Sequence, residues 1–143
     1  YGTEIAMSSS GDHGELRKDF PGGWPDDEKD AFTGNGLNET ELKAQSYLKS
    51  LLNWRKKNLA IAKGDLIHYP VKDNVYVYFR NYQKNLVMVI VNNSERAKTV
   101  YPNQYNEIIK GRTKGVNIIN DRLHYLLREI NISGKSTMIL EIH

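Results

Sequence analysis

The segment 11–24 gathers many of the side chains that could do chemistry, in the order Gly-Asp-His-Gly-Glu-Leu-Arg-Lys-Asp-Phe-Pro-Gly-Gly-Trp. Its apolar residues follow neither the helical nor the strand period, so we expect a loop. Glycine lets a backbone turn tightly and approach a ligand, while His13, Arg17, Phe20 and Trp24 offer hydrogen-bonding and stacking surfaces. This composition suits a flat, polar ligand such as a sugar. The alternative is a surface connection whose rings fold back onto the domain, because ordinary loops are also rich in glycine and proline.

Metal and thiol chemistry find little support in the sequence. The four histidines, at positions 13, 68, 124 and 143, show no ligand spacing. We interpret His68 and His124 as ordinary strand residues. The chain contains no cysteine, which excludes a disulfide framework, a thiolate metal site and a cysteine nucleophile within it. We therefore assign no metal ligands and no cofactor.

Charge and hydropathy argue against two further classes of partner. The 143 residues carry a formal net charge of only +3, with both signs mixed along the chain, so a nucleic-acid partner is not indicated. The triplet Arg-Lys-Lys at 55–57 is interpreted as the basic end of a helix rather than a nucleic-acid patch. No run of eighteen apolar residues occurs, so we expect no membrane span. No signal peptide follows Tyr1, and a start inside an apolar, strand-like segment suggests a piece of something longer.

The candidate loop lies between an expected strand and an expected helix. Residues 1–7 are half apolar and precede a Ser-Ser-Ser-Gly breaker, which indicates a short strand. The connection then continues to residue 37, and a structureless stretch of that length is usually functional or disordered. Asn38 and Glu41 form a capping box that predicts a helix over 38–57. An irregular turn is expected over 59–63, ended by Gly64.

From residue 66 onward the pattern changes to short strands. Alternation over 75–80 predicts a half-buried strand, and the apolar run 86–91 predicts a strand covered on both faces. Asn120 and Asp121 would make a two-residue hairpin turn, and one helical turn is expected at 105–109. Together these features predict a mainly β fold, an antiparallel, Greek-key-like β-sandwich preceded by one long helix. Further strands are expected at 66–69, 97–101, 116–119, 122–127, 128–132 and 136–142.

Three segments in a fixed order carry a resemblance to one family. They are Tyr-Gly-Thr-Glu-Ile at 1–5, Arg-Lys-Asp-Phe-Pro-Gly-Gly-Trp at 17–24, and Leu-Leu-Asn-Trp-Arg-Lys at 51–56 followed by Gly-Asp-Leu at 64–66. They resemble the last barrel strand, the loop after it, and the last barrel helix with its passage into the C-terminal β-domain of alpha-amylase-family glycoside hydrolases. The loop is similar to that of neopullulanase-like and cyclomaltodextrinase-like members from Bacteroides-type bacteria.

This resemblance implies a division of the chain and a function. Residues 1–64 would be the remnant of a (β/α)8 catalytic barrel, and 65–143 would be a C-terminal all-β domain that stabilises the barrel. Loops at the carboxyl ends of barrel strands build the active site of barrel enzymes. Loop 8–37 would therefore help line the substrate site of an enzyme that degrades α-glucans such as starch or maltooligosaccharides. His13, Arg17 and Trp24 are the candidate substrate-binding residues.

The resemblance also implies that the chain itself contains no catalytic residues. Retaining glycosidases need two carboxyl groups about 5 Å apart, and in this family those groups lie on strands that would precede Tyr1. The acids of the loop could in principle supply a pair, but a solvated acidic loop is the simpler interpretation; they are Asp12, Glu15, Asp19, Asp26 and Asp27. By the same resemblance the enzyme would be periplasmic or extracellular, and calcium, where present, would bind upstream.

Two further expectations remain open from the sequence. A chain without the rest of its barrel would expose apolar surface, which favours a homodimer or a rearranged N-terminal segment. The alternative function is a non-catalytic carbohydrate-binding β-sandwich module, with Tyr76, Tyr78 and Tyr82 as contacts. The ordinary interpretation of that tyrosine stripe is packing on a sheet.

Overall fold

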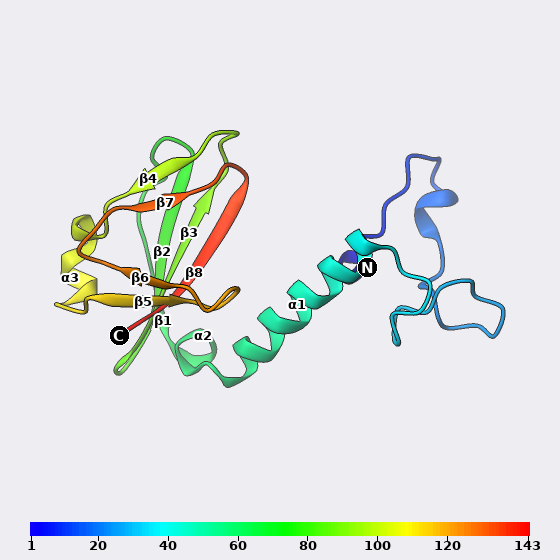
Figure 1. The fold of residues 1–143 in the computed structure, drawn as a ribbon, viewed down its shortest axis with the longest axis horizontal. Helices are drawn as coiled ribbons and strands as arrows, with labels where there is room; N and C mark the ends of the chain where they lie inside the picture. Colours follow the sequence, from blue (N-terminus) through cyan, green and yellow to red (C-terminus); the bar gives the residue numbers. More distant parts are fainter. The chain divides into compact units, whose positions relative to one another are not determined.

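The computed structural model describes all 143 residues, except for the side chain of Leu16. The chain divides into two compact units, Tyr1–Leu52 and Asn53–His143 (Figure 1). Helix α1, Glu39–Lys57, begins in the first unit and ends in the second. Among the described residues, no helix combines the length and the apolar character that crossing a membrane would require.

The expected strand at residues 1–7 is wrong. The segment forms a 3-10 turn, η1, at Thr3–Ile5. Gly2 precedes it at φ 73°, and the backbone N–H groups of Ile5 and Met7 both donate to the Gly2 carbonyl oxygen, at 3.3 and 2.9 Å. A strand needs a neighbouring strand for its backbone groups. No strand is described in this unit, so the segment satisfies those groups locally.

The long loop over 8–37 is confirmed. Among the described residues, the loop contains one helical segment, the 3-10 turn η2, Glu15–Arg17. A small apolar cluster of Ile5, Ala31 and Leu37 anchors its two ends. Beyond that cluster, backbone bonds hold the loop, including Ala31 N–H to the Pro21 carbonyl at 3.1 Å. The loop therefore has a defined path around one small apolar cluster.

The capping box at the start of α1 is confirmed. The Glu41 backbone N–H donates to Asn38 Oδ1 at 3.0 Å, and the Asn38 N–H donates to Glu41 Oε2 at 2.7 Å. The basic triplet 55–57 occupies the last turn, as expected. The irregular turn expected at 59–63 is wrong, because Leu59–Lys63 forms a second helix, α2. Its N-cap is Asn58, whose Oδ1 accepts from the Ile61 N–H at 3.1 Å. This second cap starts a new helix directly after the first.

The second unit is built from antiparallel strands. The six-stranded sheet has the order β1-β2-β3-β8-β5-β6, and β4 pairs with β7 in a separate two-stranded sheet. A short helical segment, η3 (Pro102–Tyr105) followed by α3 (Asn106–Ile109), lies where one helical turn was expected. The strands are β1 (Asp65–His68), β2 (Val75–Tyr82), β3 (Asn85–Asn92), β4 (Lys98–Val100), β5 (Lys114–Asn117), β6 (Leu123–Tyr125), β7 (Ile130–Ile132) and β8 (Ser136–Ile142).

One apolar core joins the two sheets of this unit. Phe79, Met88 and Leu140 from the large sheet are each fully buried and share a cluster with Val100 and Ile130 from β4 and β7. The register places Phe79 opposite Met88 and Met88 opposite Leu140. Alternate residues of a strand point to opposite faces, so these side chains share the core face.

Strand β3 is buried on both faces, as its apolar run predicted. Met88 and Ile90 face the core, while Val87 and Val89 lie on the other face of the sheet, called the outer face below, and are 1% and 4% exposed. Helix α2 packs beside β2 and β3. A strand covered on both sides needs no polar face, which explains its continuous apolar sequence.

The two-residue hairpin turn at 120–121 is wrong. Asn117 N–H donates to the Arg122 carbonyl at 2.9 Å, so the turn spans 118–121. The Asn117 Oδ1 accepts from Ile119 N–H at 3.0 Å, and Asp121 takes a positive φ of 55°. An Asx-type bond from Asn117 starts the turn before the Asn-Asp pair is reached.

Candidate functional site

The three candidate residues of the loop all lie on its surface. Arg17 ends η2, and the side chain of Trp24 is 66% exposed. His13 is also exposed. In the described structure no hydrogen bond, ion pair or ring contact joins His13, Arg17 and Trp24. The structure thus leaves each of them available to solvent and does not gather them into one site.

The loop aromatics behave in two different ways. Phe20 folds back, with edge contacts to Tyr1 at 6.1 Å and Phe32 at 5.7 Å between ring centroids. Trp24 does not take part in that cluster. The alternative interpretation, in which the rings of the loop fold back onto the domain, therefore holds for Phe20. The ring of Trp24 remains free for stacking.

Three of the loop acids fix turns. Asp12 Oδ1 accepts from the backbone N–H groups of Gly14 and Glu15, at 2.9 and 3.2 Å. Asp27 Oδ2 accepts from the N–H groups of Gly22 and Trp24, at 2.7 and 3.0 Å, and so folds the Pro-Gly-Gly-Trp turn.

Asp30 performs the same task further along the loop. Its carboxylate accepts from the Phe32 and Thr33 N–H groups and from the Thr33 hydroxyl, at 2.8, 3.2 and 2.7 Å. The hydrogen bond from the Thr33 hydroxyl, with those from the backbone, lowers the pKa of Asp30. The lowered pKa favours the ionised form of Asp30, and all three acids shape the loop that carries the candidate residues.

A hollow of about 420 Å³ lies at the base of the loop. Sequence reasoning missed Lys29 there, whose Nζ bonds both carboxylate oxygens of Glu41, at 2.7 and 3.0 Å. This lysine lowers the pKa of Glu41, with a further contribution from the Asn38 N–H. A lysine inside a loop carries no local signal for such a pairing. The lining combines the segments 5–8, 18–21 and 38–41 with Lys29.

A second hollow of about 400 Å³ lies in the unit Asn53–His143, on the outer face of the six-stranded sheet. Tyr76 and Tyr78, two of the three tyrosines expected to contact sugar, lie side by side on its wall. Tyr82 belongs to the same strand but does not line it. The lining residues are Arg55, Ile61, Leu66, Tyr76, Tyr78 and Arg80.

A carboxylate fixes the end of α1 to this sheet. Glu141 Oε1 on β8 accepts from Trp54 Nε1 at 2.6 Å and from Asn58 Nδ2 at 2.7 Å. Asn58 also caps α2, so one carboxylate holds the end of one helix and the start of the next. Hydrogen bonds to a charged acceptor are among the stronger ones in proteins. This contact has no local signal in the sequence, because Trp54 and Glu141 lie 87 residues apart.

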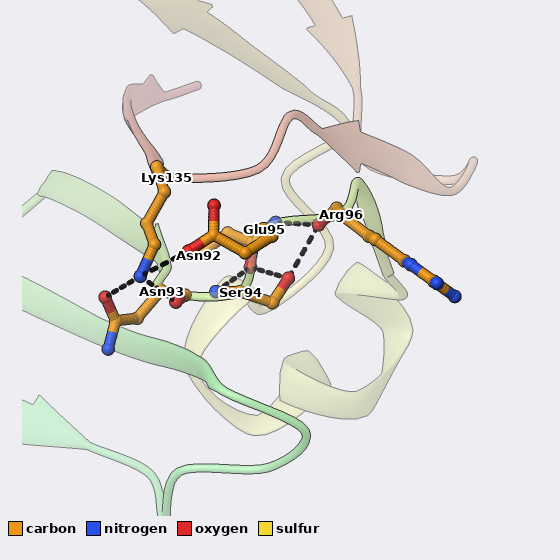
Figure 2. A network of polar contacts seen from close by, with 6 residues as sticks. All are labelled: Asn92, Asn93, Ser94, Glu95, Arg96 and Lys135. Atoms are coloured by element: carbon orange, nitrogen blue, oxygen red, sulfur yellow. Dashed lines mark hydrogen bonds and ion pairs between the residues drawn. The ribbon is translucent and has the colours of Figure 1, made fainter.

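At the far end of β3, a buried amide ties two loops together (Figure 2). Asn92 is 1% exposed, and its Nδ2 donates to the carbonyl oxygens of Arg96, Ile132 and Ser133, at 2.9, 3.3 and 2.9 Å. Its Oδ1 accepts from the Ser94 N–H and hydroxyl, at 3.0 and 2.7 Å. Every polar atom of this amide has a partner, which is typical of a structural network.

The same loops are linked at the surface. Lys135 Nζ lies 3.3 Å from Glu95 Oε1 and donates to the Asn93 carbonyl at 2.9 Å (Figure 2). Gly134 permits this approach, because a Cβ there would lie 2.2 Å from the Glu95 carbonyl oxygen. This cluster connects the β3–β4 loop with the β7–β8 loop.

His68 and His124 lie on strands, as expected. His68 is exposed on β1 and meets the Tyr76 ring edge-on at 6.3 Å. His124 on β6 has a buried Nε2 without a partner in the described structure, and burial lowers its pKa, with a smaller effect from Arg122. In the part of the chain that the structure describes, no three His, Asp or Glu side chains are grouped to hold a metal ion.

The comparisons with known proteins identify the β-rich part of the chain. Residues 66–141 match the family model "Cyclo-malto-dextrinase C-terminal domain". A cyclomaltodextrin glucanotransferase from Paenibacillus macerans is 33% identical over 102 residues, which are 71% of this chain and 12% of that protein. The chain therefore spans about one eighth of the length of this relative.

Solved structures share the fold. An alpha-amylase from Geobacillus thermoleovorans, complexed with acarbose, is 18% identical with a TM-score of 0.67, covering 100% of this chain and 28% of its own. AmyP in complex with maltose is 16% identical with a TM-score of 0.65, covering 76% of this chain and 22% of its own. Because the family model covers more than half of the residues, the chain belongs to the cyclo-malto-dextrinase C-terminal domain family, the C-terminal part of an alpha-amylase-family enzyme.

Proposed function

We propose that this chain is the C-terminal part of a glycoside hydrolase that degrades α-glucans, with residues 65–143 as the β-domain that stabilises its catalytic barrel. The observation that carries the proposal is the contact of Glu141 with Trp54 and Asn58. It fixes the end of a long helix to a domain of the matched family through charge-assisted bonds. A helix end held in this way can transmit the stability of the β-domain to whatever packs along the helix.

Residues 1–64 would then supply the last strand, loop and helix of a (β/α)8 barrel. The loop followed by a capped helix has the order of such a unit, and the alignment with the Geobacillus alpha-amylase extends over these residues too. The 3-10 turn at Thr3–Ile5 would become a strand only when neighbouring barrel strands provide its partners. The Greek-key connection of the β-domain belongs to the same proposal.

Within this enzyme, loop 8–37 would line the substrate site. Barrel active sites are built from such loops. Exposed His13, Arg17 and Trp24 supply two hydrogen-bonding groups and one stacking ring, which suit a sugar such as a maltooligosaccharide. AmyP binds maltose in its crystal structure, which is consistent with an oligosaccharide ligand for a relative. By family resemblance the enzyme would act in the periplasm or outside the cell, and any calcium would bind outside these residues.

The chain alone would be catalytically inactive. Three of its loop acids, Asp12, Asp27 and Asp30, hold backbone turns rather than forming a facing pair of carboxyl groups. Retaining glycoside hydrolysis needs two such groups about 5 Å apart. Incubation of the 143-residue chain with maltoheptaose, starch or pullulan should release no reducing sugar. Release above a heat-inactivated control would refute this part of the proposal.

The substrate role is tested in the full enzyme by Arg17→Ala. We expect kcat/KM to fall by about tenfold or more, because a group that holds the sugar is lost, while the melting temperature stays within about 1 °C. Lys49→Ala, an exposed change on α1, is the matched control. A lower melting temperature with unchanged activity per folded molecule would make Arg17 a loop staple instead.

We also propose that the isolated chain self-associates through α1. The helix has no buried residue, and its apolar side chains Leu42, Tyr47 and Leu52 are 43%, 44% and 47% exposed. Exposed apolar surface of this kind favours association. Light scattering should give the mass of a homodimer, and a strict monomer at high concentration would contradict it.

A further inference from the structure

The hollow on the outer face of the six-stranded sheet has a flat aromatic wall. Tyr76 and Tyr78 are two residues apart on β2, so they project from the same face. Their ring centroids are 5.4 Å apart and their planes differ by 34°, so the two rings form a shallow platform rather than an edge contact. Neither phenol hydroxyl makes a hydrogen bond in the described structure.

Two arginines border this platform. The guanidinium of Arg80 donates from Nη2 to the Ile61 carbonyl at 3.0 Å and from Nε to the Ala60 carbonyl at 3.4 Å. These bonds hold the guanidinium on the wall and leave its remaining N–H groups available. Arg55 approaches from the last turn of α1 and is exposed.

The charged groups that line the hollow disfavour a cation as its ligand. No carboxylate lines it, and neither arginine forms an ion pair within the described part of the chain. Hydrogen-bond donors and aromatic faces without acids disfavour a cation. They fit a ligand that presents many hydroxyl oxygens and an apolar ring face. Its volume of about 400 Å³ is within the range of small-molecule sites, roughly 300–1,000 Å³.

We propose that this hollow binds a neutral maltooligosaccharide, with glucose rings stacked on Tyr76 and Tyr78 and with Arg55 and Arg80 donating to their hydroxyl groups. The choice of an α-glucan rests on the proposed function. The site uses none of His13, Arg17 and Trp24, so it is a second place where the chain holds sugar. Leu66, 53% exposed, adds apolar surface at its margin.

The test is a calorimetric titration of the 143-residue chain with maltoheptaose. Saturable binding with Kd of about 1 mM or tighter is expected for an open site of this size. Tyr76→Ala and Tyr78→Ala should each raise Kd by about tenfold, because an aromatic contact surface is lost. Tyr76→Phe should change it by less than about threefold, since the ring remains.

Matched variants separate binding from folding. Tyr125→Ala removes a tyrosine that is 51% exposed on another strand, β6, and should leave Kd unchanged. Arg55→Gln changes an exposed residue and should raise Kd several-fold without altering the circular dichroism spectrum. If an alanine variant does not fold, Arg55→Gln still tests the site, because an unchanged Kd in that variant would overturn the arginine contact.

Three results would overturn the site itself. One is the absence of saturable binding up to about 10 mM maltoheptaose. Another is a Kd that Tyr76→Ala and Tyr125→Ala change equally. The last is tighter binding of a sulfated oligosaccharide of similar length, which would identify an anion site. The proposed function fails separately, through the absence of α-glucan turnover by the full enzyme.

Discussion

Replacing Glu141 by alanine should weaken the unit Asn53–His143 more than any comparable change at an exposed acid. The carboxylate oxygen that accepts from Trp54 Nε1 at 2.6 Å and from Asn58 Nδ2 at 2.7 Å would be lost. Both donors are half-buried, so water would replace the acceptor only in part. Asn58 also caps α2 through its Oδ1, so a change in its position would weaken that helix as well.

The magnitude follows from the two bonds. Hydrogen bonds to charged groups contribute about 1.5–3 kcal/mol each when buried. Partial exposure reduces this, so we expect a loss of about 2–3 kcal/mol in the free energy of unfolding. For a unit of 91 residues, from 53 to 143, each kcal/mol lowers the melting temperature by roughly 4–8 °C. The expected decrease is therefore about 10–20 °C.

The assay is thermal and urea denaturation of the 143-residue chain, followed by tryptophan fluorescence. The chain has two tryptophans, so a Trp24→Phe background leaves Trp54 as the reporter of this contact. Glu141→Gln keeps a neutral acceptor and should lose about half as much stability. Glu129→Ala, at an exposed position, is the matched control and should change stability by less than about 0.5 kcal/mol.

A double-mutant cycle identifies the bond itself. Trp54→Phe removes the indole donor and also the fluorescent reporter, so the cycle is followed by circular dichroism. Its effect and that of Glu141→Gln should be non-additive by about 1 kcal/mol. Additive effects, or a Glu141→Ala variant as stable as Glu129→Ala, would refute the role assigned to this carboxylate.

Two further predictions concern the same unit. Asn92→Asp should destabilise by about 3 kcal/mol in urea denaturation, because a buried carboxylate would face the carbonyl oxygens that the amide now donates to, whereas Asn93→Asp, beside Lys135, should not destabilise. An equal loss of stability in the two variants would contradict this. Burial, then the hydrogen bond to Glu107, raises the pKa of Tyr69 to about 12. The unfolded phenol ionises near pH 10, so the contribution of Tyr69 to stability should be constant below pH 10 and fall between pH 10 and 12. Measured as the urea midpoint, the fall over that interval should be smaller in Tyr69→Phe, although Tyr78 and Tyr105, whose pKa values burial also raises, still contribute to it. An unchanged pH dependence in Tyr69→Phe would assign the alkaline loss to other groups.

Elements governed by neighbouring residues were predictable from the sequence. Asn38 and Glu41 predicted the start of α1, since both hydrogen bonds of a capping box form within one turn. The apolar run of β3 predicted burial on both faces. The passage from a long helix to antiparallel strands followed from the change in period and is confirmed.

The predictions from sequence that were wrong share a physical cause. The segment 1–7 has the composition of a strand, but strand formation depends on a partner that the described unit does not provide. An irregular turn was expected over 59–63, but Asn58 caps a second helix there, and its side-chain amide also donates to a residue 83 positions later. Local composition encodes neither the presence of a neighbouring strand nor a contact with a residue so distant in the sequence.

The sequence by itself determined the family, the long loop, the capped helix and a β-rich second half, because these depend on short-range patterns and on motifs in a fixed order. Only the tertiary structure decided that Glu141 meets Trp54, that Lys29 pairs with Glu41, and that Arg55 joins Tyr76 and Tyr78 around one hollow. Such contacts depend on which residues the folded backbone brings within a few ångströms of one another. Separation along the chain carries no information about that proximity until strand order and register are known.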